Sequence, residues 1–446
     1  TLAAIGLAAF VFASCSDSNS DPAGGTAPVI NPADLTSVKL VAQQIDNSNI
    51  ANYKNSTANA RKFFLTRAGA TNFTTAMPTA PTKESFSKVL NLSGPADLTK
   101  QAYTISSGKD INFTGKKING ATIFVDGKCT MQYDETTQMS NTTIVLLSSA
   151  TLKYNGTGDM IPSGCTVYCT NPRNVFSAKN DIKINGNFYA DFRDKKSDGS
   201  KDLITGLGAI KETTPAEKDK SITPTQNITF GSGANVFIDG SIRAINLQVE
   251  DGANVYAQEN LFNNDNNGNA TINGNLYIGG FIKTRTLDVN GYLKAVEAVK
   301  VTNAFNVHDG ANVEASYINV TNNTKNGDKV IAKGEATLSL NGTDKITIGD
   351  KNVITANNLV TDNASAGQIT LAGENAVAVI KAHKFTNNGK SNIIAFATPG
   401  TNSTFLLQFQ ENYSGSKQYN TFEDLDIAAT YADYDKVADK TTPNVT

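Results

Sequence analysis

Six side chains at equivalent positions of a repeated sequence phrase could together bind a ligand. If they align on one side of stacked strands about 4.8 Å apart, the rings of Phe237, Tyr256 and Tyr277 stack as a ladder. Such an aromatic strip could dock the apolar face of a sugar, while charged groups at one end form hydrogen bonds to it. The six residues of this predicted outward column are Tyr189, Phe237, Tyr256, Tyr277, Lys294 and Glu314.

The same column also has a purely structural interpretation. Aromatic residues form strands well, and rings on neighbouring strands stabilise a sheet by stacking on one another. Alternatively, the ladder lies beneath the charged insertion at residues 193–226. The sequence leaves binding and stabilisation open.

Residues that could perform catalysis do not gather in the repeat. Asp251 and Asp309 share the turn position before a glycine, but Asn273 and Asn290 interrupt that column. Turn aspartates are usually turn formers. The two histidines lie several repeats from each other along the chain, which argues against a shared metal. We therefore expect no catalytic residues, no metal and no cofactor.

Three cysteines, Cys129, Cys165 and Cys169, lie within the repeat region. Cys165 and Cys169 are four residues apart, so an extended segment turns both sulfurs to the same face. Two buried thiols in the interior are one interpretation. A disulfide between Cys129 and either of them is the other, if the compartment is oxidising.

The elements that position these side chains are short strands of one repeat. The repeated phrase is apolar, polar, apolar, then Asn or Asp, then Gly, as in residues 182–186, 270–274 and 287–291. Alternation followed by a turn signal predicts a short strand with one buried face. Glycines recur at nearly even spacing along this region, at positions 233, 252, 274, 291 and 310. A period of about 19 residues predicts one coil of a β-solenoid.

A second strand follows each glycine and supplies the predicted interior. Asn235, Asn254 and Asn312 open three of these strands, so their amides could bond to one another along the stack. The residues predicted to point inward are Phe188, Val236, Val255, Leu276, Leu293 and Val313, together with Ala190, Ile238, Ala257, Ile278, Ala295 and Ala315.

Asn-Gly phrases such as residues 118–120 and 184–186 give the repeat region a resemblance to a known class. The pattern resembles the right-handed parallel β-helix, in particular its versions in Bacteroidota-type lipoproteins. This resemblance implies an all-β, single-chain parallel β-helix, capped at both ends, in which each coil is one repeat of about 19 residues.

The N-terminus is predicted to carry an export signal. Residues 2–13 are an apolar run too short to span a bilayer, which is typical of a signal-peptide core. The Ala13-Ser14-Cys15 stretch resembles a bacterial lipobox, and residues 16–21 resemble the acidic export signal of surface-exposed Bacteroidota-type lipoproteins. The resemblance implies that Cys15 is lipidated and that the protein is anchored to the outer membrane, facing the exterior.

The chain is predicted to have five parts. Residues 1–15 are the signal peptide with Cys15, 16–31 a flexible tether, 32–97 an N-terminal segment or cap, 98–397 the β-helix with the insertion at 193–226, and 398–446 a C-terminal cap or the start of a further region.

The charge balance limits the partners. With 39 basic and 41 acidic side chains the net charge is −2, so we expect no binding to nucleic acid. The predicted function is a lipid-anchored, non-enzymatic surface β-helix that binds a glycan or other surface polymer in adhesion or matrix building. The alternatives are a β-helix polysaccharide lyase or glycoside hydrolase, and a purely structural surface spacer.

Overall fold

The computed structural model describes the chain in several stretches, and every regular element in them is a β-strand. The chain divides into two compact units, Thr57–Val296, and Glu297–Thr446 together with Thr1–Ser56. Each unit is considered by itself below. The described residues are 76–83, 88–90, 96–106, 108–192, 206–207, 226–263, 268–326, 329–332, 336–341, 345–349, 352–362, 369–372, 377–387, 394–396, 404–409 and 418–419.

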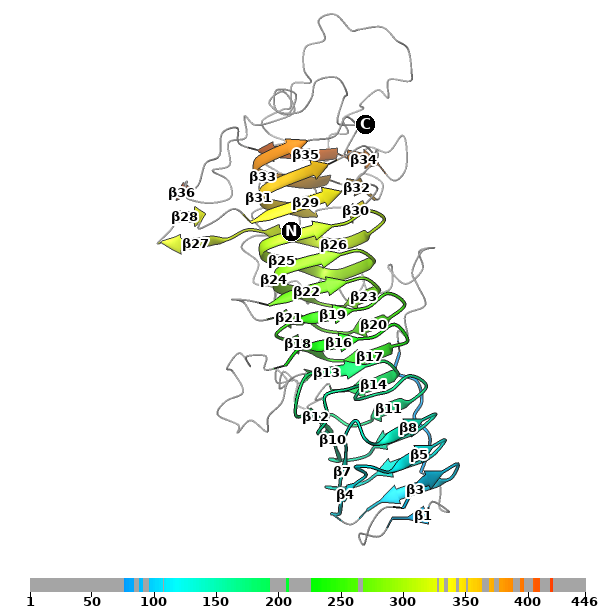
Figure 1. Cartoon of the computed structure of the whole chain (residues 1–446). Helices are drawn as coiled ribbons and strands as arrows, with labels where there is room; N and C mark the ends of the chain where they lie inside the picture. The colour runs from blue at the N-terminus through cyan, green and yellow to red at the C-terminus, as the bar shows by residue number, and fades with distance from the viewer. Residues whose placement is uncertain are drawn as a thin grey trace, which may run out of the picture. The chain divides into compact units, whose positions relative to one another are not determined.

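In the unit Thr57–Val296, successive coils contribute strands that pair in parallel with their equivalents in the next coil (Figure 1). One stack of paired strands carries the predicted aromatic column, and we call it the aromatic face. Its strands are β1 (Lys88–Val89), β3 (Ala102–Ile105), β6 (Thr122–Val125), β9 (Thr143–Leu146), β11 (Thr166–Cys169), β14 (Asn187–Asp191), β17 (Asn235–Asp239), β20 (Asn254–Ala257), β23 (Asn275–Ile278) and the start of β25 (Tyr292–Val307).

The other strands of this unit form further parallel stacks. The second set contains β2 (Leu98–Thr99), β5 (Lys117–Asn119) and β8 (Gln138–Ser140), and then β13 (Ile182–Ile184), β16 (Ile228–Phe230), β19 (Leu247–Val249), β22 (Asn269–Ile272) and the end of β24 (Phe281–Val289). The third set contains β4 (Asp110–Asn112), β7 (Thr130–Tyr133), β10 (Thr151–Tyr154) and β12 (Val175–Ala178), and then β15 (Gly206–Leu207), β18 (Ser241–Ala244), β21 (Leu261–Asn263) and the start of β24.

The predicted all-β parallel solenoid is confirmed, with a slightly longer coil than predicted. Coils average about 21 residues instead of about 19. Equivalent asparagines in neighbouring coils are 17, 19 or 21 residues apart. The separation rises to 48 residues between Asn187 and Asn235, where the 193–226 insertion lies. Part of this insertion belongs to the solenoid, since β15 pairs in parallel with β18.

The predicted interior columns are present and in register. Phe188, Val236, Val255, Leu276 and Leu293 pair in succession, and none is more than 1% exposed. The second predicted column, from Ala190 to Ala295, follows the same register and is equally buried. Like side chains therefore meet like side chains along the interior, which buries apolar surface at every coil.

The predicted asparagine ladder is also present. The side chain of Asn275 donates a hydrogen bond to Asn254 (2.9 Å), Asn254 donates to Asn235 (3.3 Å), and Asn235 donates to Asn187 (3.3 Å). Asn187 in turn donates to the hydroxyl of Thr166. The ladder thus satisfies half-buried amides at the start of every strand that it crosses.

Two different constraints select glycine in the turns. Gly252 has a φ of 81°, a left-handed conformation that glycine adopts without strain. Gly274 has no such φ, but a Cβ there would collide with the carbonyl oxygen of Glu250 in the preceding coil. The repeated glycine therefore permits both the turn and the close approach of neighbouring coils.

The second unit has parallel strand stacks as well. Val313 and Ala315, predicted to point inward, are buried in it. Its strands are the remainder of β25, β26 (Asn312–Val320), β29 (Thr337–Asn341), β30 (Lys345–Ile348), β31 (Val353–Asp362), β32 (Ile369–Leu371), β33 (Val377–Asn387), β34 (Ile394–Phe396) and β35 (Thr404–Phe409). An antiparallel group comprises β27 (Asn323–Asn326), β28 (Lys329–Ala332) and β36 (Gln418–Tyr419).

Strand pairing extends beyond the predicted solenoid range at both ends. β1 precedes residue 98 and pairs with β3, while β35 follows residue 397 and pairs with β33. Some of the predicted N-terminal cap and some of the predicted C-terminal region therefore contribute strands to the stacks.

Replacing Asn254 with Ala should lower the free energy of unfolding by about 1–2 kcal/mol, because it removes two ladder bonds. Asn275→Ala removes one and should cost about half as much. Denaturant unfolding followed by circular dichroism checks the order. An equal loss in both variants would contradict the two-to-one ratio, and no loss in either would show that the ladder does not stabilise the stack.

Candidate functional site

The predicted outward column is in register over five of its six members. Tyr189, Phe237, Tyr256, Tyr277 and Lys294 pair in succession from β14 to β25. Glu314 lies on β26 in the other unit, where it pairs with Thr347. The aromatic residues and Lys294 therefore form one column in the unit Thr57–Val296, whereas Glu314 belongs to the other unit.

The column continues to residues that the sequence analysis missed. Tyr168 on β11 pairs with Tyr189, and Val145 and Phe124 continue the column on β9 and β6. The coils of Val145 and Tyr168 lack the repeated Asn-Gly phrase before the strand, so these residues were not aligned with the others, whereas Asn119-Gly120 does precede β6 and could have placed Phe124. The Thr-Val-Tyr-Cys segment of β11 nevertheless alternates as β20 does, and this alternation was the available signal.

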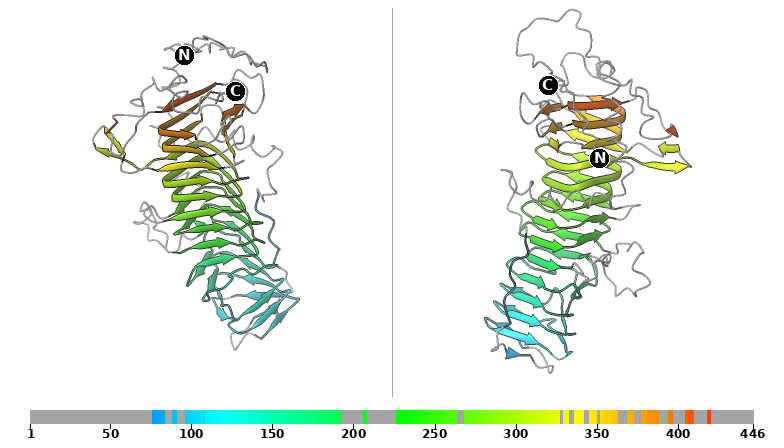
Figure 2. Two further views of the ribbon diagram at one scale, coloured as in Figure 1. Left: turned by 45° about the horizontal axis from the view of Figure 1, so that its top comes forward. Right: turned by 180° about the vertical axis from the view of Figure 1, so that it is seen from behind.

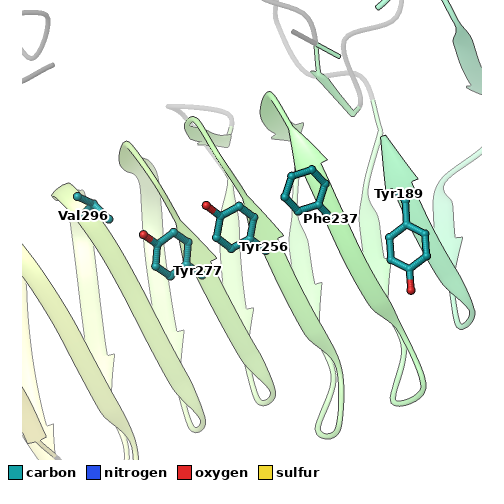
Figure 3. Close-up of a cluster of buried hydrophobic side chains, with 5 residues drawn as sticks. All are labelled: Tyr189, Phe237, Tyr256, Tyr277 and Val296. Carbon is teal, nitrogen blue, oxygen red and sulfur yellow. The ribbon is translucent and has the colours of Figure 1, made fainter. Parts of the chain in front are cut away.

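The rings of the column stack as predicted (Figure 3). The centroids of Phe237 and Tyr256 are 5.3 Å apart with an interplanar angle of 6°, and those of Tyr256 and Tyr277 are 4.6 Å apart at 10°. Near-parallel rings in such a stack turn their faces toward one another. The column therefore presents ring edges, and not free ring faces, away from the sheet.

The column is buried, although it lies on the outside of the strands. Phe237 is 4% exposed, Tyr277 6%, and Tyr189 and Tyr256 9%. Outward positions on other strands are far more accessible: Lys153 on β10 and Gln248 on β19 are exposed. Since stacking between coils is common to all faces, the difference means that the aromatic face is covered by other parts of the chain.

One cover is an N-terminal segment, residues 76–83, which we call the strap. Met77 packs against the cluster formed by the four aromatic residues and Val296. At the other end of the strap, the Nζ of Lys83 lies 2.9 Å from the Oδ2 of Asp126, just after β6. The strap, drawn in blue ahead of β1, runs along the side of the coils (Figures 1 and 2).

The length of the strap matches this course. From Met77 to Lys83, six residues of extended chain span about 20 Å. From β6 to β14, the first strand that carries a member of the cluster, there are three coil steps, at about 4.8 Å each. The strap is therefore long enough to reach the cluster from Asp126. The alternative cover, the 193–226 insertion, is described only at β15, which pairs with β18 of the third set, and at Gln226, which donates hydrogen bonds to the carbonyls of Ala178 and Asn180.

The ion pair at the end of the strap is weak. The hydrogen bond from Lys83 lowers the pKa of Asp126, against the opposing effect of burial. A lowered carboxyl pKa gives stability that is present above the ordinary carboxyl pKa and is lost as the pH falls through the lowered value. Both side chains are about one third exposed, so solvent screening limits the pair to about 0–1 kcal/mol.

A second aromatic contact, which the sequence analysis also missed, lies on the third set of strands. The guanidinium of Arg243 sits 4.5 Å from the ring centroid of Phe262, its neighbour in register. Phe262 in turn meets the ring of Phe281 edge-on at 5.0 Å. Arg243 is only 3% exposed, and this burial lowers its pKa.

The three cysteines of the unit are buried free thiols, as one of the two interpretations predicted. The disulfide alternative is therefore not formed. Burial raises the pKa of both Cys165 and Cys169. Since the thiolate is the reactive form, raised pKa values make these side chains unreactive.

In the described stretches, no group of three or more His, Cys, Asp or Glu side chains is arranged to hold a metal ion. Within the same stretches, no helix is long and apolar enough to cross a membrane. The predicted signal peptide, Cys15 and the tether lie outside the described residues.

Comparisons with protein-family models, with curated proteins and with solved structures found no match to this chain. The β-solenoid architecture is shown by the structure itself. The Bacteroidota-type lipoprotein identity and the glycan-binding role of the column stay predictions.

The buried thiols should resist labelling in the native protein. In a Cys15→Ser background, we expect Cys129, Cys165 and Cys169 to react with a thiol reagent such as DTNB only after denaturation. Ser140→Cys, at an exposed position of β8, supplies a matched thiol that should react at once. Native labelling of Cys169 as fast as that of Ser140→Cys would contradict the buried placement.

Proposed function

We propose that this chain is a lipid-anchored, non-enzymatic structural element on the outer face of a bacterial outer membrane, serving attachment or matrix building. One observation carries the structural part of the proposal. The aromatic face, which has the side chains best suited to bind a polymer, is buried along the column from Tyr189 to Tyr277. A solenoid that uses this face for its own packing is better suited to a scaffold than to a sugar platform.

The location rests on the sequence. An apolar run of a dozen residues followed by Ala13-Ser14-Cys15 and an acidic segment supports lipidation of Cys15 and export to the surface. A tether of small and polar residues after Cys15 would hold the solenoid away from the lipid surface.

Glycan binding is the second candidate function, and Tyr168 favours it. This ring is half-buried and lies at 49° to the ring of Tyr189, with 5.2 Å between the centroids. The tilt leaves Tyr168 outside the near-parallel stack, so its ring is the member of the column most open to a sugar. Binding there would use the part of the aromatic face that carries Tyr168 and Tyr189.

Anchoring can be tested with Cys15→Ser in a Bacteroidota-type host. The unchanged protein should incorporate a clickable palmitate analogue and should be degraded by proteinase K added to intact cells. Cys15→Ser should lose the label and leave the membrane fraction, because the thiol that carries the lipid is gone.

Ser14→Ala is the matched control, since it keeps a small residue beside the cysteine and should be labelled normally. Equal labelling of Cys15→Ser would remove the lipid anchor from the proposal. Complete protection from proteinase K would remove the surface location.

A further inference from the structure

The Asn-Gly steps in the turns of the solenoid are places where the chain can modify itself. The backbone nitrogen of the glycine attacks Cγ of the asparagine; the N–Cγ bond forms, the Cγ–Nδ2 bond breaks, and the amide proton leaves with Nδ2 as ammonia. Water then opens the succinimide ring to aspartate or isoaspartate, so a neutral side chain becomes a carboxylate. Hydrogen bonds to the glycine N–H or to the asparagine side chain oppose this reaction, because ring closure needs both groups.

Five Asn-Gly steps have both residues described, and four of them are held by hydrogen bonds between coils. In each of the four, the glycine N–H donates to a carbonyl of a neighbouring coil. The donor–acceptor pairs are Gly120–Ser140 (2.9 Å), Gly186–Ile161 (3.0 Å), Gly274–Val249 (3.2 Å) and Gly291–Ile272 (3.0 Å). The asparagine side chains are held as well, Asn119 by Ser140, Asn185 by Asp159, and Asn273 and Asn290 by each other.

The fifth step, Asn155-Gly156, lies in a longer corner of the coil. Residues 155–160 follow β10, whereas residues 134–137 form the equivalent corner one coil earlier. Within the described part of the chain, neither the Gly156 N–H nor the Asn155 side chain has a hydrogen-bond partner. Asn155 is half-buried, so water reaches it. Both groups that must react are therefore free at this step.

Packing in the same corner requires glycine at position 156. A Cβ there would collide with Oε2 of Glu135 and with the hydroxyl of Tyr154. Glycine is also the residue whose nitrogen is least shielded from attack on a neighbouring side chain, since it has no side chain of its own. The loop is held on the far side of the reacting nitrogen, where the Gly156 carbonyl accepts from the amide of Asn180 (2.8 Å) and the Thr157 N–H donates to Glu135 (3.2 Å).

We propose that Asn155 is a site of spontaneous deamidation, and that among the five described Asn-Gly steps it is the one that reacts in the folded protein. The other four must first break a bond between coils, which confines their reaction to rare openings of the stack. The product adds a carboxylate to a loop that already contains Asp159 and contacts Glu135. This inference goes beyond the structural role proposed above, since it gives the folded chain an acidic form that accumulates with age.

Isotope labelling of the full chain tests the site. Purified Cys15→Ser protein is kept at mildly alkaline pH in water enriched in heavy oxygen, digested with trypsin and analysed by mass spectrometry. Trypsin releases Asn155 within residues 154–173, Asn119 within 118–128 and Asn290 within 286–294. Any other asparagine in these peptides precedes a proline, whose nitrogen has no proton to lose. We expect heavy oxygen to enter at Asn155 at least tenfold faster than at Asn119 or Asn290.

Unfolding supplies the control for local sequence. In denaturant the three rates should converge, because the three peptides share the Asn-Gly step and the bonds between coils are gone. Equal rates in the native protein would overturn the proposal. A rate difference that persists after unfolding would overturn it as well, since the local sequence and not the fold would then set the reactivity.

Charge separation of aged protein tests the same site by substitution. Native ion-exchange chromatography should resolve an acidic form that grows with time and elutes with Asn155→Asp. Asn155→Gln should not form it, because the longer side chain closes a ring far more slowly. Asn119→Gln is the matched control and should form it like the unchanged chain. Far-UV circular dichroism verifies that each variant is folded. An acidic form that grows undiminished in Asn155→Gln would contradict the assignment.

Discussion

The structure depends on parallel stacking of equivalent strands in register. Neighbouring coils in such a stack are about 4.8 Å apart, so each side chain lies directly against its equivalent in the next coil. The constraint favours sequences in which like residues recur, since like side chains pack or hydrogen-bond well with one another. The interior column from Phe188 to Leu293, the amide ladder ending at Asn275, and the ring stack from Phe237 to Tyr277 are three consequences of this one register.

The same register determines which surface the rings of the aromatic face present. Rings that stack on equivalents in the next coil use their faces for that contact and leave their edges outward. The outward edges still form apolar surface, and the strap covers part of it through Met77. Packing on both sides of one strand set makes this face part of the core in energetic terms, although it lies outside the coils.

Much of this architecture could be predicted from the sequence because the interactions repeat. Alternation and the recurring glycine indicated the strands, the coil and the inward residues, and the position of Asn235 and Asn254 indicated the amide ladder. Contacts made once could not be predicted in this way. The Lys83–Asp126 pair joins residues 43 positions apart, with no repeated pattern to suggest the partner. The packing of Met77 on the column is another contact made once, which is why the sequence left binding and stabilisation open. The Arg243–Phe262 contact was missed because a single Arg beside a single Phe has no counterpart in the next coil.

The register itself is the central claim, and spin labelling measures it most directly. Thr229 on β16 and Gln248 on β19 are outward partners in neighbouring coils. In a Cys15→Ser background, nitroxides attached to Thr229→Cys and Gln248→Cys together would lie about 5 Å apart. This spacing predicts an electron paramagnetic resonance spectrum dominated by spin exchange, with the hyperfine lines collapsed. A doubly labelled spectrum equal to the sum of the two single labels would contradict the register and with it the account of the ladders.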